Sequence, residues 1–179
     1  MTPPESPAAN ATGVEDWILH RQVQSFLINE AHLLDDKRFE EWLTLFDTDG
    51  MYWAPVDPLL KNPAEGLSHI AEDIVFLTAR VRRLSEPTAY SEQPPSRMCR
   101  LVANVAIEER NRSAALIMVR SKLAVMEFRA RVDGEDESRT FAATVHHCLR
   151  PEGGRFRIVQ KRVDLINSDA AFYGVATPF

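Results

Sequence analysis

The feature that most constrains the fold is a pair of helical patterns close together near the start of the chain. Large apolar residues recur every three or four positions in residues 23–34 and again in residues 39–46, which is typical of helices that bury one face. Asp35 and Asp36 separate the two patterns, and Asp36 is placed to cap the second helix. The pattern predicts a helical hairpin. We expect the apolar face of this hairpin to pack against a sheet.

A third helix is predicted after an extended segment at residues 51–56 and a loop at residues 57–66 that contains Pro and Gly. In the third pattern the apolar positions step by four and three, and Ser68 is placed to cap the helix. These positions are Ile70, Ile74, Leu77, Val81 and Leu84. The opposite face is charged, so we expect this helix to bury one side only.

The second half of the chain alternates with a period of two, which is typical of strands. Extended segments are expected at residues 100–108, 114–132, 139–150 and 156–166. In the second of them the apolar face changes phase near Ser121, which predicts a bulge or strong bend, and Asp133 and Gly134 mark a hairpin turn. We predict an α+β domain whose N-terminal helices pack in a strongly curved, mainly antiparallel sheet.

The two ends of the chain differ from its body. Residues 1–15 are rich in Pro, Ala and small polar residues, so we expect a flexible N-terminal arm. Residues 16–179 are expected to form one domain, because 179 residues with 45% hydrophobic content suffice for one sizeable core. The apolar tail at residues 167–179 includes Phe172 and Phe179, and we expect it to dock on this chain or on another subunit.

Charge and composition narrow the classes of function. Lys and Arg number 21 against 26 Asp and Glu, a net charge of −5, which gives no overall attraction to nucleic acid or anionic lipid. No apolar run approaches the roughly 18 residues of a membrane span, and the first residues do not resemble a signal peptide. Cys99 and Cys148 fit two reduced thiols. We therefore predict a cytoplasmic protein without nucleic-acid or membrane partners.

A curved sheet can enclose a pocket, and several ionisable or hydroxyl residues are candidates to line it. They are Asp35, Tyr52, His69, Arg97 and His146. Asp35, Tyr52 and His146 together would support general acid–base chemistry on a small organic molecule. Each also has an ordinary structural interpretation, at a helix end, in the packing of the sheet or on a polar strand face. His146 and Cys148 share one face of a predicted strand, but without a fitting carboxylate they indicate no metal site.

Arginine residues are concentrated in the middle of the chain, on the third predicted helix and just after Pro94 and Pro95. Such a cluster is either a solvated face or a contact for a partner. The planar guanidinium group binds carboxylates in bidentate fashion, which suits interfaces. Together with the aromatic residues of the tail, four of these arginines are the expected subunit contacts. The set comprises Arg80, Arg83, Arg97, Arg100, Phe172 and Phe179.

Three groups of short motifs follow one another between residues 17 and 166. The first group is Phe26-Leu27, Glu30-Ala31, Leu34-Asp35, Phe39, Trp42 and Tyr52-Trp53-Ala54-Pro55. The second is Glu72-Asp73, Leu77, Arg80-Val81 and Arg83-Leu84, and the third is Pro94-Pro95-Ser96-Arg97, Arg100 and Asn104-Val105. In this order and spacing the motifs resemble the small (β) subunits of aromatic-ring-hydroxylating dioxygenases, the Rieske non-haem iron oxygenases.

This resemblance implies a cystatin-like cone of the nuclear-transport-factor-two type. It also implies a larger α subunit with a Rieske 2Fe–2S centre and a mononuclear Fe(II), usually in an assembly of three α and three β chains. Electrons from NAD(P)H reach the α subunit through separate redox proteins, a ferredoxin and a reductase. The β subunit is then mainly structural, without cofactors or catalytic residues, and the sequence lacks the paired Cys and His ligands that a Rieske centre needs.

Two alternatives stay open at this point, because the same cone also serves small isomerases and dehydratases. A stand-alone dehydratase or isomerase would use Asp35, Tyr52 and His146. A non-catalytic domain that binds a small molecule is the other alternative. The resemblance favours the dioxygenase β subunit over both.

Overall fold

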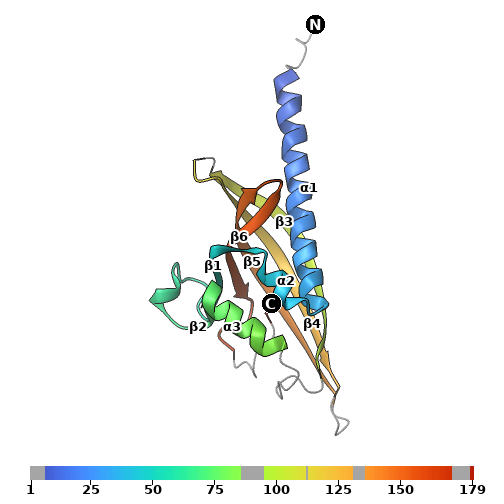
Figure 1. Ribbon diagram of the computed structural model, residues 1–179, viewed down its shortest axis with the longest axis vertical. Helices are drawn as coiled ribbons and strands as arrows, with labels where there is room; N and C mark the ends of the chain where they lie inside the picture. Colours follow the sequence, from blue (N-terminus) through green and yellow to red (C-terminus); the bar gives the residue numbers. More distant parts are fainter. Residues whose placement is uncertain (1–6, 86–94, 112, 131–135, 171–177) are drawn as a thin grey trace.

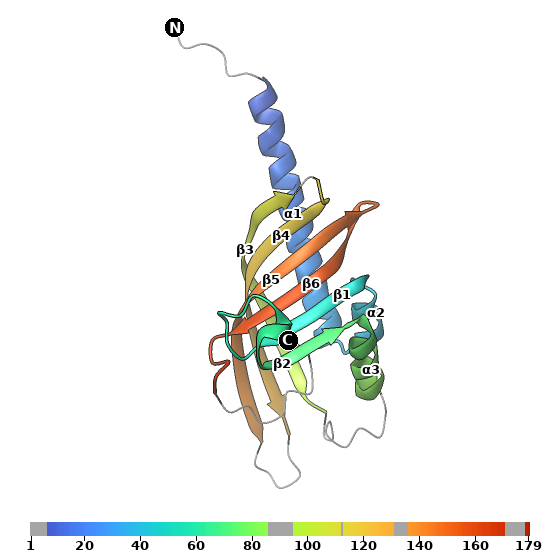
Figure 2. The ribbon, with the colours of Figure 1, turned by 90° about the vertical axis from the view of Figure 1, so that its left-hand side faces the viewer.

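The structure is a computed structural model that describes residues 7–85, 95–111, 113–130, 136–170 and 178–179, with side chains from residue 13 onward. In this part of the chain the helices are α1 (Pro7–Asp35), α2 (Phe39–Leu43), the short 3-10 helix η1 (Pro63–Glu65) and α3 (Ile74–Ser85). The strands are β1 (Phe46–Pro55), β2 (Ser68–Asp73), β3 (Arg97–Asn111), β4 (Leu116–Arg129), β5 (Glu137–Glu152) and β6 (Arg155–Leu165). They form one sheet in the order β2-β1-β6-β5-β4-β3, and α1 lies along one side of it (Figure 1, Figure 2).

The sheet is strongly curved and mainly antiparallel, so the predicted α+β fold class is confirmed. The four strands predicted in the second half of the chain are β3 to β6, and each pairs antiparallel with the next. Strands β1 and β6 pair in parallel, with Trp53 opposite Arg162. The predicted hairpin turn at Asp133 and Gly134 lies outside the described residues.

Strand β4 keeps one buried face along its length, so the phase change predicted near Ser121 is wrong. Its odd-numbered residues are buried throughout residues 117–127, whereas Met126 lies on the other face and is 38% exposed. The irregularity lies in the neighbouring strand β3, whose register shifts within residues 103–106. Asn104 has a φ of 50° there, a left-handed conformation that asparagine adopts more readily than most residues. The bulge therefore bends the sheet from its edge strand.

Helix α1 is longer than the sequence pattern predicts, because it begins at Pro7, inside the predicted flexible arm of residues 1–15. Its N-terminal end extends past the edge of the sheet (Figure 1, Figure 2). The helix buries one stripe of side chains against the sheet and the other helices. The stripe comprises Val23, Leu27, Glu30, Ala31 and Leu34.

The second helix of the predicted hairpin is only one turn long. Helix α2 ends at Leu43, and Phe46 already belongs to β1. Asp36 does not cap it, because its backbone N–H still bonds to the His32 carbonyl oxygen and Arg38 occupies the position before the helix. The apolar spacing was nevertheless informative, because the large side chains of this turn are buried.

The third helix also starts later than predicted. Residues 68–73, expected as its first turns, form β2 and pair with β1. Helix α3 begins at Ile74, and Asp73 caps it by accepting hydrogen bonds from the backbone N–H groups of Val75 and Phe76. Ile70 faces the core, but from a strand. The prediction failed because an apolar residue four positions before Ile74 is compatible with a helix and with a strand.

The core lies between the inner face of the sheet and the three α-helices. The ring of Trp42 packs edge-to-face against Phe46 and Tyr52, with centroids 5.1 and 5.9 Å apart. Phe179, the last residue of the printed sequence, is also in this core and packs edge-to-face on Phe141 at 5.4 Å. Burying each of these large side chains contributes on the order of 1.5–3 kcal/mol. At Phe179 the tail thus docks on its own chain.

Candidate functional site

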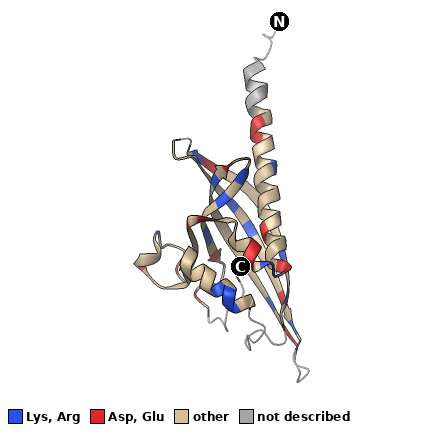
Figure 3. Cartoon of the chain, in the orientation of Figure 1, with Lys and Arg blue, Asp and Glu red and all other residues tan. Residues whose placement is uncertain are grey.

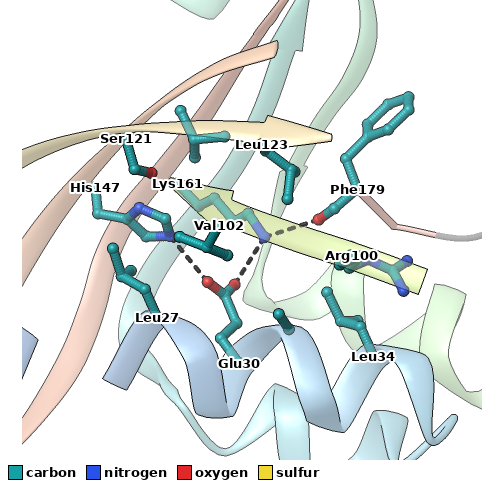
Figure 4. A pocket seen from close by; sticks show the side chains of 12 residues that line it. Leu27, Glu30, Leu34, Arg100, Val102, Ser121, Leu123, His147, Lys161 and Phe179 are labelled. Carbon is teal, nitrogen blue, oxygen red and sulfur yellow. Dashed lines mark hydrogen bonds and ion pairs between the residues drawn. The ribbon is translucent and has the colours of Figure 1, made fainter. Parts of the chain in front are cut away.

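Three charged or polar side chains meet in the centre of the core, and each is at most 3% exposed. Glu30 reaches from α1 toward the sheet (Figure 4). Its Oε1 lies 2.7 Å from the Lys161 Nζ, and its Oε2 lies 3.0 Å from the His147 Nε2. The indole N–H of Trp42 also donates to Glu30, at 3.1 Å. The carboxylate thus has partners from β5, β6 and α2.

Strand register explains why the two basic side chains meet. His147 of β5 and Lys161 of β6 are directly opposite each other in the antiparallel pair, and both lie on the inner face of the sheet. Cross-strand neighbours of this kind have side chains that touch. Glu30 lies between Leu27 and Leu34 on the buried stripe of α1, so the helix presents one carboxylate to this pair.

The surroundings of Glu30 favour its ionised form. Burial alone would raise the pKa of Glu30, but the attraction of Lys161 and His147, together with their hydrogen bonds, lowers that pKa well below its ordinary value of 4.5. Burial has the opposite sign for a cation and lowers the pKa of Lys161, and the Glu30 carboxylate opposes that shift. Glu30 is therefore charged in the folded protein at neutral pH.

The lowered pKa of Glu30 predicts acid sensitivity. Because the unfolded chain takes up the proton first, the contribution of Glu30 to stability is complete above pH 4.5 and is lost as the pH falls toward the folded-state pKa. We expect the Glu30→Gln variant to lose less of its unfolding free energy than the wild type between pH 5 and about 3, measured by urea unfolding. Glu41→Gln is the control: the hydrogen bond from Arg38 also lowers the pKa of Glu41, but this ion pair is exposed to solvent, so the variant should change the slope less than Glu30→Gln does. Equal slopes for all three proteins would contradict the assignment.

A second ion pair, in which only the arginine is fully buried, holds the end of α1. The Arg100 guanidinium is 2.6 Å from an Asp35 carboxylate oxygen, and the Arg100 backbone N–H donates to the other oxygen at 2.9 Å. The same guanidinium donates from Nη2 to the Pro178 carbonyl oxygen at 2.6 Å. The Arg100 side chain is 1% exposed. It therefore joins α1, β3 and the tail.

Of the three residues predicted to support acid–base chemistry, two are engaged by other groups of the chain and the third points away from the core. Asp35 bonds to Arg100, and Tyr52 accepts a hydrogen bond from the Phe179 backbone N–H at 2.8 Å. His146, however, lies on the outer face of β5, 3.4 Å from Asp164. The placement of His146 in the pocket is wrong because the inward residues of β5 here are odd-numbered. Its neighbour His147 lines the core instead.

The space enclosed at this cluster is small. A cavity of about 20 Å³ is lined by apolar side chains of α1 and the sheet and by the polar groups of Glu30, Arg100, His147 and Lys161. This volume holds about one water molecule, whereas sites for small molecules usually measure ~300–1,000 Å³. Within the described part of the chain, the Arg100 Nε and the His147 Nδ1 are buried without a hydrogen-bond partner. Within the described part of the chain, this cavity is thus too small for an aromatic ring.

The predicted subunit contacts fall into two groups. Arg83 is exposed near the end of α3, where the basic residues cluster (Figure 3). Arg97 is also exposed and lies over the Phe128 ring at 4.6 Å, and Arg80 is half-buried against Glu72.

Two of the remaining predicted contacts lie inside this chain rather than on its surface. Arg100 and Phe179 are buried in the core, which corrects their assignment as surface contacts. Phe172 lies outside the described residues.

The structure reveals a surface that the sequence analysis missed. Val14, Trp17 and Ile18, near the projecting end of α1, are 57%, 65% and 44% exposed. Further along the same helix, a cleft of about 760 Å³ separates α1 from the turn between β5 and β6. Arg21 and Arg157 are among the residues that line it. The helical spacing of Val14, Trp17 and Ile18 is visible in the sequence. Only the structure shows that no part of the described chain covers these three apolar residues.

Comparison with known proteins identifies the family. Residues 29–170 match the family model described as the ring hydroxylating beta subunit. The chain belongs to this family. A curated relative is the small oxygenase component of the p-cumate 2,3-dioxygenase system of Pseudomonas putida, which is 35% identical over 82% of this chain and 78% of its own length. Another is the beta subunit of the N,N-dimethyl phenylurea N-demethylase of a Sphingobium strain, 34% identical over 86% of this chain and 84% of its own.

Solved structures agree with the family assignment. The beta subunit of the benzoate 1,2-dioxygenase of Burkholderia mallei superimposes with a TM-score of 0.67 at 25% identity, over 81% of this chain and 89% of that one. This ring-hydroxylating beta subunit therefore has the cone fold of its relatives. Among the described residues, no three His, Cys, Asp or Glu side chains are grouped to hold a metal ion. None of the described helices is long and apolar enough to cross a membrane.

Proposed function

We propose that this ring-hydroxylating beta subunit is the structural partner of a larger catalytic α subunit in a cytoplasmic dioxygenase that oxidises aromatic compounds. The α subunit would hold the Rieske 2Fe–2S centre and the mononuclear Fe(II), in an assembly of three α and three β chains. Electrons from NAD(P)H would arrive through a ferredoxin and a reductase. The main support in the structure is the filled cone, whose cavity of about 20 Å³ is too small for an aromatic ring.

The same observation speaks against a stand-alone dehydratase or isomerase. Such an enzyme needs a substrate-sized pocket and a base that reaches into it. Asp35 is paired with Arg100, Tyr52 is bonded to Phe179, and His146 lies on the outer face of the sheet. No structural observation on these three residues favours chemistry in this chain.

Isolation of the native protein tests the proposal. We expect the 20.3 kDa chain, recovered from its own cells without overexpression, to elute in a complex several times its mass. The complex should contain a larger polypeptide and the visible absorbance of an iron–sulfur centre. A colourless homo-oligomer without a larger polypeptide would overturn the proposal.

The exposed residues of α1 are our candidate for the main contact with the partner. Buried aromatic anchors dominate the binding energy of most interfaces, and Trp17 is a large apolar side chain left 65% exposed. We expect Trp17→Asp to weaken assembly at least about 30-fold, measured by sedimentation of the complex at decreasing concentration. Leu59→Asp, at an exposed apolar residue near η1, is the matched control. Unchanged melting temperatures would show that both variants fold, and equal assembly of both would exclude Trp17 from the interface.

A further inference from the structure

The last two residues of the printed sequence are held as a ligand is held in a binding site. The Phe179 main-chain oxygen accepts a hydrogen bond from the Lys161 Nζ at 2.8 Å, and its N–H donates to the Tyr52 hydroxyl at 2.8 Å. The Pro178 oxygen accepts from Arg100 at 2.6 Å. The Phe179 ring packs on Phe141, and the residue is 2% exposed. An aromatic group and two oxygen acceptors therefore occupy the core beside the cavity at Arg100 and Lys161.

The groups that hold this segment belong to the body of the fold. Lys161 is on β6, Arg100 on β3 and Tyr52 on β1, so the sheet positions them whether or not the tail is bound. Glu30 stays paired with Lys161 and His147, and Asp35 stays paired with Arg100. Without the tail, Lys161 and Arg100 would each lose one of their acceptors, and the Tyr52 hydroxyl would lose its donor. Buried cations with an acceptor position left open favour a ligand that supplies an acceptor.

We propose that the cone of this subunit is a binding site for small aromatic carboxylates that its own residues 178–179 keep closed. The aromatic ring of such a ligand takes the place of the Phe179 ring against Phe141. Its carboxylate takes the place of the two main-chain oxygens beside Lys161 and Arg100. The cavity of about 20 Å³ that remains next to these groups then merges with the space that Phe179 fills. Tail and ligand are mutually exclusive.

The test compares the full chain with a variant that lacks residues 178–179, and the probe is 3-phenylpropionate. We expect the variant to melt below the wild type and to gain about 3–6 °C at a probe concentration roughly ten times its Kd. The wild type should not respond, because Phe179 fills the site. Propionate, which lacks the ring, and 3-phenylpropan-1-ol, which lacks the charge, are the control probes and should bind at least about tenfold more weakly.

In this comparison, either of two outcomes would overturn the proposal. One is a cooperatively folded variant that 3-phenylpropionate does not stabilise, and the other is an equal response of the wild type. If the shortened chain does not fold, Phe179→Ala replaces it, because this variant keeps the main-chain contacts and loses only the ring. Toluene is then the probe, since apolar cavities of this kind bind small aromatic molecules. A folded Phe179→Ala variant without response to toluene would equally overturn the proposal.

The melting temperature is measured without the partner subunit, so this test is independent of the proposed role in assembly.

Discussion

Replacing Lys161 by Met is expected to lower the free energy of unfolding by about 3–5 kcal/mol, because the change leaves the buried Glu30 carboxylate without its cationic partner. Lys161 is 3% exposed and its Nζ lies 2.7 Å from Glu30. Its hydrogen bond to the Phe179 oxygen is lost as well. Urea unfolding at pH 7, followed by circular dichroism, measures the difference.

Two control variants distinguish the loss of the buried Glu30–Lys161 ion pair from the effect of removing any lysine. Lys122→Met removes an exposed lysine that bonds to Thr144 on the neighbouring strand, and it should change stability by less than about 0.5 kcal/mol. The double variant Glu30→Leu with Lys161→Met removes both charges and should be more stable than Lys161→Met alone. A single variant as stable as the wild type would show that the Glu30–Lys161 pair is not buried in solution.

Arg100→Ala is expected to destabilise the chain by about 2–4 kcal/mol, because one side chain holds both the end of α1 and the tail. Its guanidinium is buried, although the Asp35 carboxylate that it binds is 20% exposed, which moderates the cost. The Pro178 oxygen loses its donor at the same time. We therefore expect faster proteolysis of the C-terminal residues in this variant, measured by mass spectrometry after brief carboxypeptidase treatment.

Arg97→Ala is the natural comparison, since the two arginines are close in sequence and were expected to act alike. Arg97 is exposed and packs over Phe128, so its loss should cost less than about 1 kcal/mol. Any effect of Arg97→Ala on assembly would then report on the interface itself. Equal destabilisation by both variants would contradict the buried position of Arg100.

The strands of the second half were predictable because one face of each is buried and period-two alternation follows directly from that. The boundaries of the helices were harder to predict from the sequence. Ile70 and Ile74 have helical spacing, yet pairing with β1 places Ile70 in a strand. In β4, the change of phase was predicted because Met126 is large and apolar, whereas the buried residue beside it is Glu127. Tertiary pairing, which a local pattern does not contain, decided both cases.

The central cluster was missed for a related reason. A glutamate within an apolar helical stripe and a lysine within a strand normally indicate the exposed face. Glu30 and Lys161 are buried because each compensates the other. Recognising this requires the register that places His147 opposite Lys161. For the tail, the sequence left open whether it docks on this chain or on another subunit, and the structure places Phe179 in the core of its own chain.

The parallel pair of β1 and β6 has a consequence for how the chain reaches its native state. Phe46 lies beside Ile158 in this pair, so this contact of the sheet joins two segments that lie far apart in the sequence. Contacts of such long sequence separation slow folding, because a large loop must close before they form. During synthesis β1 cannot pair with β6 until residues 155–165 have left the ribosome. The apolar faces of the helices and of β1 therefore stay partly uncovered until β6 has been made.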